Sequence, residues 1–125
     1  MKTATHTNPK AQRLVIGISG ASGTIYGVRA LEMLRATPVE THLVLSKAGE
    51  MTASYETDLR SSDIRALADH NYAIGDVGAA ISSGSYQTMG MLIAPCSVKT
   101  MSEIATGVTS TLLTRAADVV LKERR

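Results

Sequence analysis

A glycine-rich loop is the segment best suited to hold an anion. The residues Gly-Ala-Ser-Gly-Thr occupy positions 20–24, between an apolar run that predicts a strand and an amphipathic segment that predicts a helix. Backbone N–H groups at a helix start, the helix dipole and two hydroxyl groups together suit a phosphate. We therefore predict that this loop binds phosphate; the alternative is a tight strand–helix turn with an ordinary cap.

Three known fingerprints do not fit this loop. A P-loop requires a lysine after its last glycine, whereas Thr24 follows Gly23. The dinucleotide-binding pattern fails because Ser19 stands in the place of its middle glycine, and no acid follows the second expected strand. The serine-hydrolase elbow needs a different spacing, and the three histidines are scattered. Triphosphate hydrolysis, NAD binding and a serine triad are thus disfavoured.

A second loop repeats the chemistry of the first. Ser97, Val98, Lys99 and Thr100 follow a third apolar run, and they offer two hydroxyl groups, one cation and a new helix N-terminus. They could hold a second anion, or the same phosphate from its other side. The alternative is that Ser97 only caps the helix and Lys99 is solvated. Ser46 likewise stands where a helix N-cap is expected after the second strand.

The other candidates are single residues or a helix stripe. Arg115, Asp118 and Lys122 share one face of the last expected helix, where Asp118 could pair with both cations. This stripe is either solvated surface or a site for an anionic substrate. Cys96 borders the presumed site without a visible base partner, and His42 is expected to be a core or surface histidine. No spacing indicates a metal site.

Strands and helices in alternation must position these loops. Apolar runs predict three strands, at 14–18, 41–45 and 89–94. Helical patterns follow at 25–34, 47–55, 62–68, from Ser97 to about 106, and from about 110 to 122. Residues 71–85 resist assignment, apart from a loop at 82–85. The alternation predicts an α/β fold, with a parallel sheet covered by helices on both faces. Because parallel strands share a carboxyl edge, residues 19–23, Ser46 and Ser97 should converge.

Composition bounds the class of protein. The 125 residues suit one domain, and the net charge of +2 with no Trp or Phe argues against a nucleic-acid surface. Apolar runs of about six residues are too short to span a membrane, and one cysteine excludes an internal disulfide. We expect a cytoplasmic protein with a disordered tail over 1–12 and a domain over 13–125. Its last helix ends where such a sheet would normally continue, which suggests a missing C-terminal part.

The motifs together resemble one known family. Residues 13–29 (Arg-Leu-Val-Ile-Gly-Ile-Ser-Gly-Ala-Ser-Gly-Thr-Ile-Tyr-Gly-Val-Arg) look like the opening of the UbiX-type flavin prenyltransferases. This family includes subunits of phenolic and hydroxyarylic acid decarboxylases. Later segments agree in order, at 40–47, 81–85, 95–100 and 114–125. The combination is highly specific, although Gly-Ala-Ser-Gly alone would not be.

The resemblance implies a fold, a cofactor and a reaction. The fold would be a three-layer, flavodoxin-like or Rossmann-like sheet, assembled into a homododecamer with flavin sites at subunit junctions. Members transfer a dimethylallyl group from dimethylallyl monophosphate to N5 and C6 of reduced FMN, without a metal. The prenylated FMN then serves a UbiD-type decarboxylase, in ubiquinone biosynthesis or in aromatic compound metabolism.

Residue roles follow by position from the same resemblance. The implied FMN contacts are Gly20, Ala21, Ser22, Ser46, Ser97, Val98, Lys99 and Thr100. Ser22 and Glu56 match catalytic residues, one near the reacting flavin and one that handles the leaving phosphate. Arg115 and Lys122 match basic residues around the prenyl phosphate. The family's next strand, with an Arg-Glu pair, and its later Tyr and Lys positions lie beyond Arg125, so we expect weak FMN binding and little turnover from this chain.

Two other functions fit parts of this pattern. A non-catalytic, FMN-binding subunit of a phenolic or hydroxyarylic acid decarboxylase system would bind flavin without prenylating it. A flavin-dependent decarboxylase of cysteinyl substrates is less favoured, because its characteristic histidine has no match. Decarboxylation of aromatic acids by this chain alone is disfavoured, because nothing in it resembles the partner enzyme.

Overall fold

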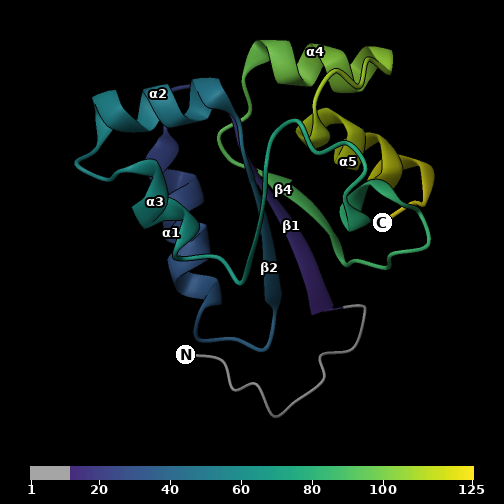
Figure 1. Cartoon of the computed structure of the whole chain (residues 1–125), viewed down its shortest axis with the longest axis horizontal. Coiled ribbons are helices and arrows are strands. Elements are labelled where there is room, and N and C mark those ends of the chain that lie inside the picture. Colours follow the sequence, from purple (N-terminus) through teal and green to yellow (C-terminus); the bar gives the residue numbers. More distant parts are fainter. Residues whose placement is uncertain (1–11) are drawn as a thin grey trace.

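Strands and helices alternate along the part of the chain that the structure describes. The structure is a computed structural model, and it describes residues 12–125 (Figure 1). The predicted tail over residues 1–12 lies outside this range except for its last residue, Gln12. None of the described helices is long and apolar enough to cross a membrane.

A parallel sheet of four strands forms the centre of the molecule. The strands are β1 (Arg13–Ile18), β2 (Glu40–Leu45), β3 (His70–Tyr72) and β4 (Gly90–Ile93), and they lie in the order β3-β2-β1-β4. All three pairings are parallel, which confirms the predicted parallel α/β class. Apolar side chains from both sides of the central strands enter the core, because helices cover both faces.

The prediction of three strands is wrong, because β3 is missing from it. Its sequence, His-Asn-Tyr, is short and polar, and none of its residues is buried. Its extended form is fixed by pairing with β2, where His70 lies opposite His42 and Tyr72 opposite Val44. Strand formation here depends on the neighbouring strand rather than on an intrinsic preference.

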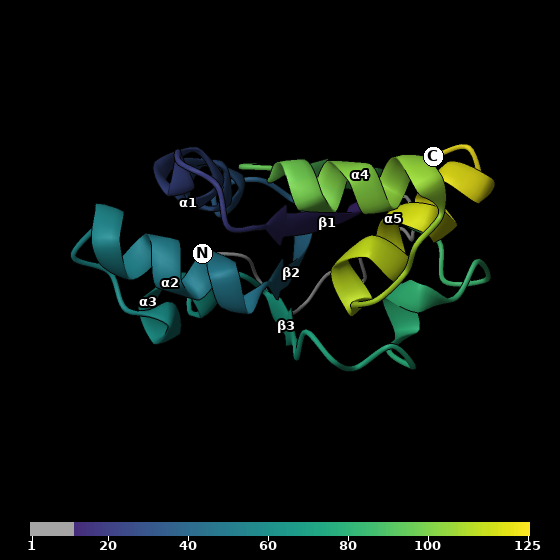
Figure 2. The same cartoon turned by 90° about the horizontal axis from the view of Figure 1, so that it is seen from above.

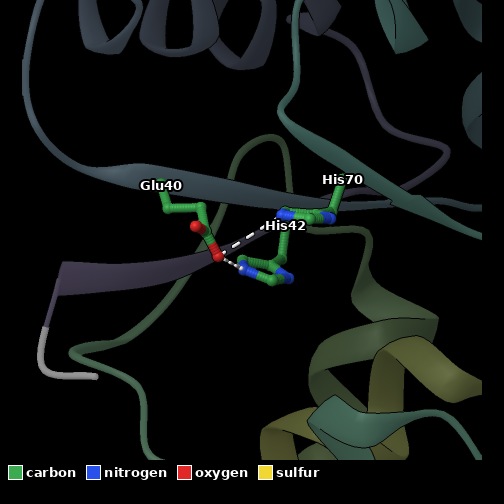
Figure 3. A group of neighbouring side chains, drawn as sticks. All are labelled: Glu40, His42 and His70. Carbon is green, nitrogen blue, oxygen red and sulfur yellow. Dashed lines mark hydrogen bonds and ion pairs between the residues drawn. The ribbon is translucent and has the colours of Figure 1, made fainter. Parts of the chain in front are cut away.

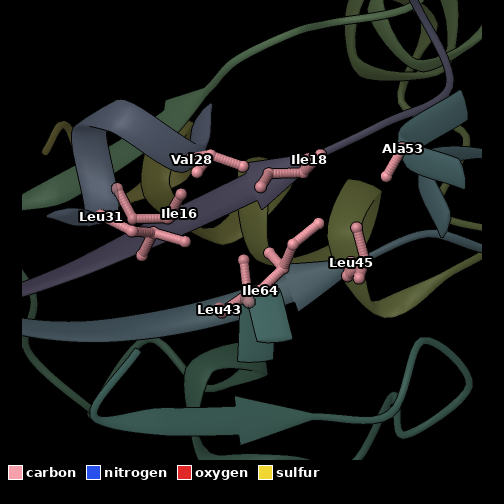
Figure 4. Packing of buried hydrophobic residues seen from close by; sticks show 8 residues of the cluster. All are labelled: Ile16, Ile18, Val28, Leu31, Leu43, Leu45, Ala53 and Ile64. Carbon is pink, nitrogen blue, oxygen red and sulfur yellow. The ribbon is translucent and has the colours of Figure 1, made fainter. Parts of the chain in front are cut away.

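Helices α1 (Thr24–Leu34), α2 (Lys47–Glu56) and α3 (Ser61–Arg65) lie on one side of the sheet (Figures 1 and 2). Figure 4 shows the apolar cluster beneath them, which consists of Ile16, Ile18, Val28, Leu31, Leu43, Leu45, Ala53 and Ile64. Alternate residues of β1 and β2 supply this cluster, because side chains in a strand point to opposite faces in turn. The core therefore fixes which residues of β2 face the other side.

The other face is covered by α5 (Leu112–Lys122) and a short 3-10 helix, η2 (Ala80–Ser82). The buried residues there are Val15, Val44, Ala79, Ile81, Leu112, Leu113 and Ala116. Helices on both faces confirm the predicted three-layer arrangement (Figure 2). Helix α4 (Val98–Thr106) has no buried residue and lies, with α2, near the ends of the strands (Figure 1).

Most predicted helices agree closely with the structure, but the one over 62–68 is too long. α3 ends at Arg65, and residues 66–69 form turns and bends. Two hydrogen bonds explain the early end, because the carboxylate of Asp69 accepts from the backbone N–H of Thr41 at 2.8 Å and from its hydroxyl at 3.2 Å. These bonds draw the chain back to the sheet, where β3 begins.

Candidate functional site

The loops after β1, β2 and β4 meet at the carboxyl edge of the sheet. The Ser19 hydroxyl donates to the carbonyl of Pro95 at 2.8 Å and accepts from the backbone N–H of Ser97 at 2.7 Å. The backbone N–H of Ser46 donates to the carbonyl of Ile18 at 3.0 Å. The predicted convergence of these loops is therefore confirmed, and hydrogen bonds hold the three loops against one another.

These loops surround a cavity of about 250 Å³. Five of the eight predicted FMN-binding residues line it: Gly20, Ser46, Ser97, Lys99 and Thr100. The other three, Ala21, Ser22 and Val98, are not part of its lining, and the Val98 side chain points into solvent with 74% of its surface exposed. The remaining lining residues are Lys47, Ala48, Ile74, Glu103, Thr111, Leu113 and Thr114.

Three helix N-termini open onto this cavity. Residues from the first turns of α2, α4 and α5 line it, together with the N-cap residues Ser46, Ser97 and Thr111. Each helix start carries partial positive charge on its unpaired N–H groups. The cation of Lys99 adds to this potential, although its Nζ also lies 3.8 Å from Oε2 of Glu103. The cavity therefore favours a negatively charged group.

Ser46 and Ser97 are N-caps, as predicted. The Ser46 hydroxyl oxygen accepts from the backbone N–H of Gly49 at 2.9 Å, and that of Ser97 accepts from the backbone N–H of Thr100 at 3.1 Å. The Ser97 hydroxyl also donates to the Thr100 hydroxyl at 2.9 Å. Capping fixes both oxygens at the cavity wall. As an acceptor of a cap bond, the Ser46 hydroxyl can still donate its hydrogen to a ligand.

Gly20 lets the first loop approach α2 closely. A Cβ at this position would lie 2.4 Å from Cβ of Ala48 and 3.0 Å from its carbonyl carbon. These are well inside ordinary van der Waals separations of about 3.5–4.0 Å. The absence of a side chain here is what allows β1 and α2 to share one cavity wall.

The two predicted catalytic residues, Ser22 and Glu56, lie together beside the start of α1. Oε1 of Glu56 accepts from the backbone N–H of Gly23 at 3.0 Å and of Thr24 at 3.2 Å. A hydrogen bond from the Ser22 side chain, followed by those two backbone bonds, holds the pKa of Glu56 below its ordinary value. Glu56 is therefore a carboxylate near neutral pH. It accepts hydrogen bonds from the backbone N–H groups of the first loop, which were predicted to bind a phosphate.

Arg115 and Lys122 lie on α5 and are exposed. Neither lines the cavity, although Arg115 directly follows the lining residue Thr114. Lys122 lies two helical turns further along, roughly 10 Å away. No ion pair joins Asp118 to either cation within the described residues 12–125, so the possible pairing along this stripe is not formed.

Four polar lining residues were not among the predicted site residues: Lys47, Glu103, Thr111 and Thr114. Thr111 and Thr114 form a capping box at the start of α5, in which each side chain accepts from the other's backbone N–H. Glu103 lies one turn after Lys99, and its pKa is lowered chiefly by the hydrogen bond from the Ser110 hydroxyl, which spans 2.7 Å. The threonine pair, three residues apart before an apolar run, is a signal that could have identified the α5 cap.

Comparison with known proteins places this arrangement in a family. The Flavoprotein family matches residues 2–125. The chain is 59% identical over 114 residues to flavin prenyltransferase UbiX of Neisseria meningitidis serogroup B, covering 91% of this chain and 60% of that protein. It therefore spans about three fifths of the length of such relatives.

Two solved structures have the same fold over the described part. AnUbiX (PadA1), in complex with FMN and dimethylallyl pyrophosphate, superposes with a TM-score of 0.90 and 48% identity, over 92% of this chain and 61% of that one. The dodecameric FMN-dependent Ubix-like decarboxylase of Escherichia coli O157:H7 gives a TM-score of 0.89 and 48% identity, over 90% and 62%. The chain belongs to the Flavoprotein family and, within it, to the UbiX-type flavin prenyltransferases.

Proposed function

We propose that this chain forms the nucleotide-holding part of a flavin prenyltransferase. The reaction would transfer a dimethylallyl group from dimethylallyl monophosphate to reduced FMN, giving prenylated FMN for a UbiD-type decarboxylase. The observation that carries the proposal is the single cavity onto which three helix N-termini and Lys99 open. The 59% identity to a flavin prenyltransferase supports the same reaction class.

The residues around the cavity fit the phosphate end of FMN. Helix N-termini bind phosphate through their N–H groups and dipoles, and the cation of Lys99, 3.8 Å from Oε2 of Glu103, adds positive charge. A volume of about 250 Å³ is below the roughly 300–1,000 Å³ of typical small-molecule sites, so it matches part of a flavin nucleotide. Ser46, Ser97, Lys99 and Thr100 would hold the phosphate end, and Gly20 would allow its close approach. Bound reduced FMN would supply the nucleophilic ring that accepts the prenyl group.

Ser22 and Glu56 are the proposed catalytic residues. Transfer breaks the C–O bond between the allyl carbon and the phosphate, and negative charge builds up on the departing phosphate. The carboxylate of Glu56 fixes Ser22 and the start of α1 through its hydrogen bonds. In this arrangement the Ser22 hydroxyl is oriented by Glu56, and proton transfer to the phosphate would require Glu56 to gain a proton first. Arg115 and Lys122 would neutralise the phosphate.

The proposed partners follow from the relatives. The AnUbiX structure contains FMN and dimethylallyl pyrophosphate, and the Escherichia coli relative is described as dodecameric. We infer a homo-oligomer with dimethylallyl monophosphate as second substrate. Large exposed apolar side chains, among them Tyr26, Tyr55 and Met101, are compatible with subunit contacts.

The test is an anaerobic incubation with reduced FMN and dimethylallyl monophosphate, followed by mass spectrometry of the flavin. The proposal expects FMN to bind more tightly than riboflavin, which lacks the phosphate, and a small share of the flavin to gain one prenyl unit. Lys99→Gln should reduce the preference for FMN over riboflavin. Lys122→Gln, the matched control, should leave FMN affinity unchanged and slow only the transfer. Equal affinity for FMN and riboflavin in the unsubstituted chain would contradict the phosphate site.

A second function, a non-catalytic FMN-binding subunit of a decarboxylase system, is favoured by one observation. The phosphate cavity is formed by the described residues, whereas Arg115 and Lys122, proposed for the prenyl phosphate, stand outside it. This function predicts FMN binding with no mass gain, together with co-purification of a decarboxylase.

A further inference from the structure

Glu40, His42 and His70 form a cluster at the other end of β2 from the cavity (Figure 3). Oε1 of Glu40 lies 2.7 Å from Nε2 of His42 and 3.4 Å from Nε2 of His70. One potential ligand atom from each residue lies within 4.8 Å of the other two. The cluster is at the amino end of β2, about 16 Å along the strand from the cavity edge. Nothing in the proposed transfer reaction uses it.

Backbone register brings these residues together. Glu40 and His42 are two positions apart on β2, so their side chains point to the same face of the sheet. His70 on β3 lies directly opposite His42 in the parallel pairing. Neighbouring positions of this kind place side chains within reach of one another. The proximity of the three groups is therefore a property of the sheet and does not depend on one side-chain conformation.

The ligand types select a class of ion. Two imidazole nitrogens and one carboxylate oxygen suit Zn²⁺, Co²⁺, Ni²⁺ or Cu²⁺, whereas Mg²⁺ and Ca²⁺ prefer oxygen ligands alone. Three protein ligands leave a fourth position for water. We propose that Glu40, His42 and His70 bind one divalent transition-metal ion, with Zn²⁺ as the representative, and that this ion ties the edge strand β3 to β2.

The surroundings of His42 support ligation. His42 is fully buried, and its Nδ1 lies 2.8 Å from the hydroxyl of Tyr72. A metal-bound histidine is normally oriented by such a hydrogen bond on its second nitrogen. The phenol oxygen of Tyr72 can accept a hydrogen bond from this nitrogen. When the ion binds Nε2, the single N–H proton of neutral His42 resides on Nδ1 and forms a hydrogen bond to the Tyr72 hydroxyl. His42 therefore releases no proton on binding the ion.

Two features must change when the ion binds. The rings of His42 and His70 are stacked, with centroids 4.5 Å apart and planes 16° apart, so their nitrogen lone pairs do not meet at one point. His70 is 52% exposed and can turn toward Glu40, whereas His42 stays in place. Nε of Arg13 lies 3.9 Å from Oε1 of Glu40 and competes with the ion for the carboxylate. This guanidinium also stacks over the Tyr86 ring at 3.9 Å, and it can keep that contact after Glu40 turns to the metal.

The test is calorimetric titration of tag-free, chelator-treated protein with Zn²⁺, with Mg²⁺ as the negative probe. We expect one Zn²⁺ per chain, no heat with Mg²⁺, and a higher urea midpoint with Zn²⁺ present, because an ion that binds only the folded state stabilises it. Co²⁺ should give the visible absorption of a low-symmetry, four-coordinate site. His70→Ala alters an exposed residue and should weaken binding more than 10-fold, and Tyr72→Phe should weaken it about 10-fold.

His6→Ala is the matched control, because His6 is the one histidine outside the cluster. It should leave Zn²⁺ affinity and the Co²⁺ spectrum unchanged. The proposal is overturned if Zn²⁺ does not bind one to one, if His70→Ala binds it as tightly as the unsubstituted chain, or if His6→Ala abolishes binding. Flavin binding in His70→Ala should be unchanged, which separates this site from the proposed function.

Discussion

Adding one methyl group at Gly20 tests whether the close approach of the first loop to α2 builds the site. In Gly20→Ala the new Cβ would lie 2.4 Å from Cβ of Ala48. It would also lie 3.0 Å and 3.2 Å from the carbonyl carbon and Cα of Ala48, and backbone atoms cannot rotate out of the way. The first turn of α2, which carries Ser46 and Lys47 at the cavity wall, must therefore move away from β1.

Two opposing effects determine the change in stability. Overpacking of this kind typically costs about 1–3 kcal/mol. Replacing glycine by alanine also restricts the unfolded chain, which stabilises the folded state by about 0.4–1 kcal/mol. We expect a net loss of about 1–2 kcal/mol in the free energy of unfolding. FMN should bind about 10-fold more weakly, equivalent to about 1.4 kcal/mol, because the cavity wall is displaced.

The assays are urea unfolding followed by circular dichroism and titration of FMN fluorescence. Gly75→Ala is the matched control: nothing lies within 4 Å of the Cβ it would add, so it should be neutral or slightly stabilising. Ala48→Gly combined with Gly20→Ala removes the shortest contact and should recover at least about 0.5 kcal/mol relative to additive behaviour. A Gly20→Ala protein with unchanged urea midpoint and unchanged FMN affinity would refute the reasoning.

Three further predictions concern single side chains at the site. Glu56→Gln should destabilise the protein near neutral pH but progressively less below about pH 4. The pKa of Glu56 is lower in the folded state, so its carboxylate stabilises the fold above the unfolded-state pKa, and this stabilisation is lost as the pH falls through the folded-state pKa. Urea midpoints at several pH values measure the difference between the two proteins, and a pH-independent difference would contradict the prediction. Ser97→Ala removes the hydrogen bond that caps α4 at the Thr100 N–H and should lower the stability of this helix by about 1 kcal/mol. The Thr100 amide should then exchange its hydrogen faster, whereas the control Ser102→Ala, in the middle of the helix, should leave that exchange unchanged. Burial raises the pKa of the Cys96 thiol, so iodoacetamide should alkylate it more slowly than free cysteine at pH 8. A rate equal to that of free cysteine would be the contrary result.

The regular elements that frame the site could be predicted because their signals are local. β1, β2 and β4 are apolar runs that end at glycine, serine or proline, and the following helices have an apolar stripe. The caps at Ser46 and Ser97 needed only the residue type and its place before a helix. Parallel pairing then follows from the alternation of strands and helices, and convergence at one edge follows from parallel pairing.

Contacts between distant segments could not be predicted in this way. The carboxylate of Glu56 reaches the start of α1 from a position 33 residues later in the chain. By composition alone it is an exposed acid, and only the packing of α2 beside α1 makes it a helix cap. The capping box of α5, by contrast, has a local signal, but its place at the cavity depends on where α5 crosses the sheet.

Short-range hydrophobic periodicity and breaker residues encode the layered architecture and the loops at the carboxyl edge, so both could be predicted from the amino-acid sequence. The formation of β3 by His-Asn-Tyr and the position of His70 opposite His42 depend instead on tertiary packing. Strand register is set by the packing of the whole sheet, and a slip of one residue would point His70 to the opposite face. Groups that meet through register leave no regular spacing in the sequence, and the cluster of Glu40, His42 and His70 is of this kind.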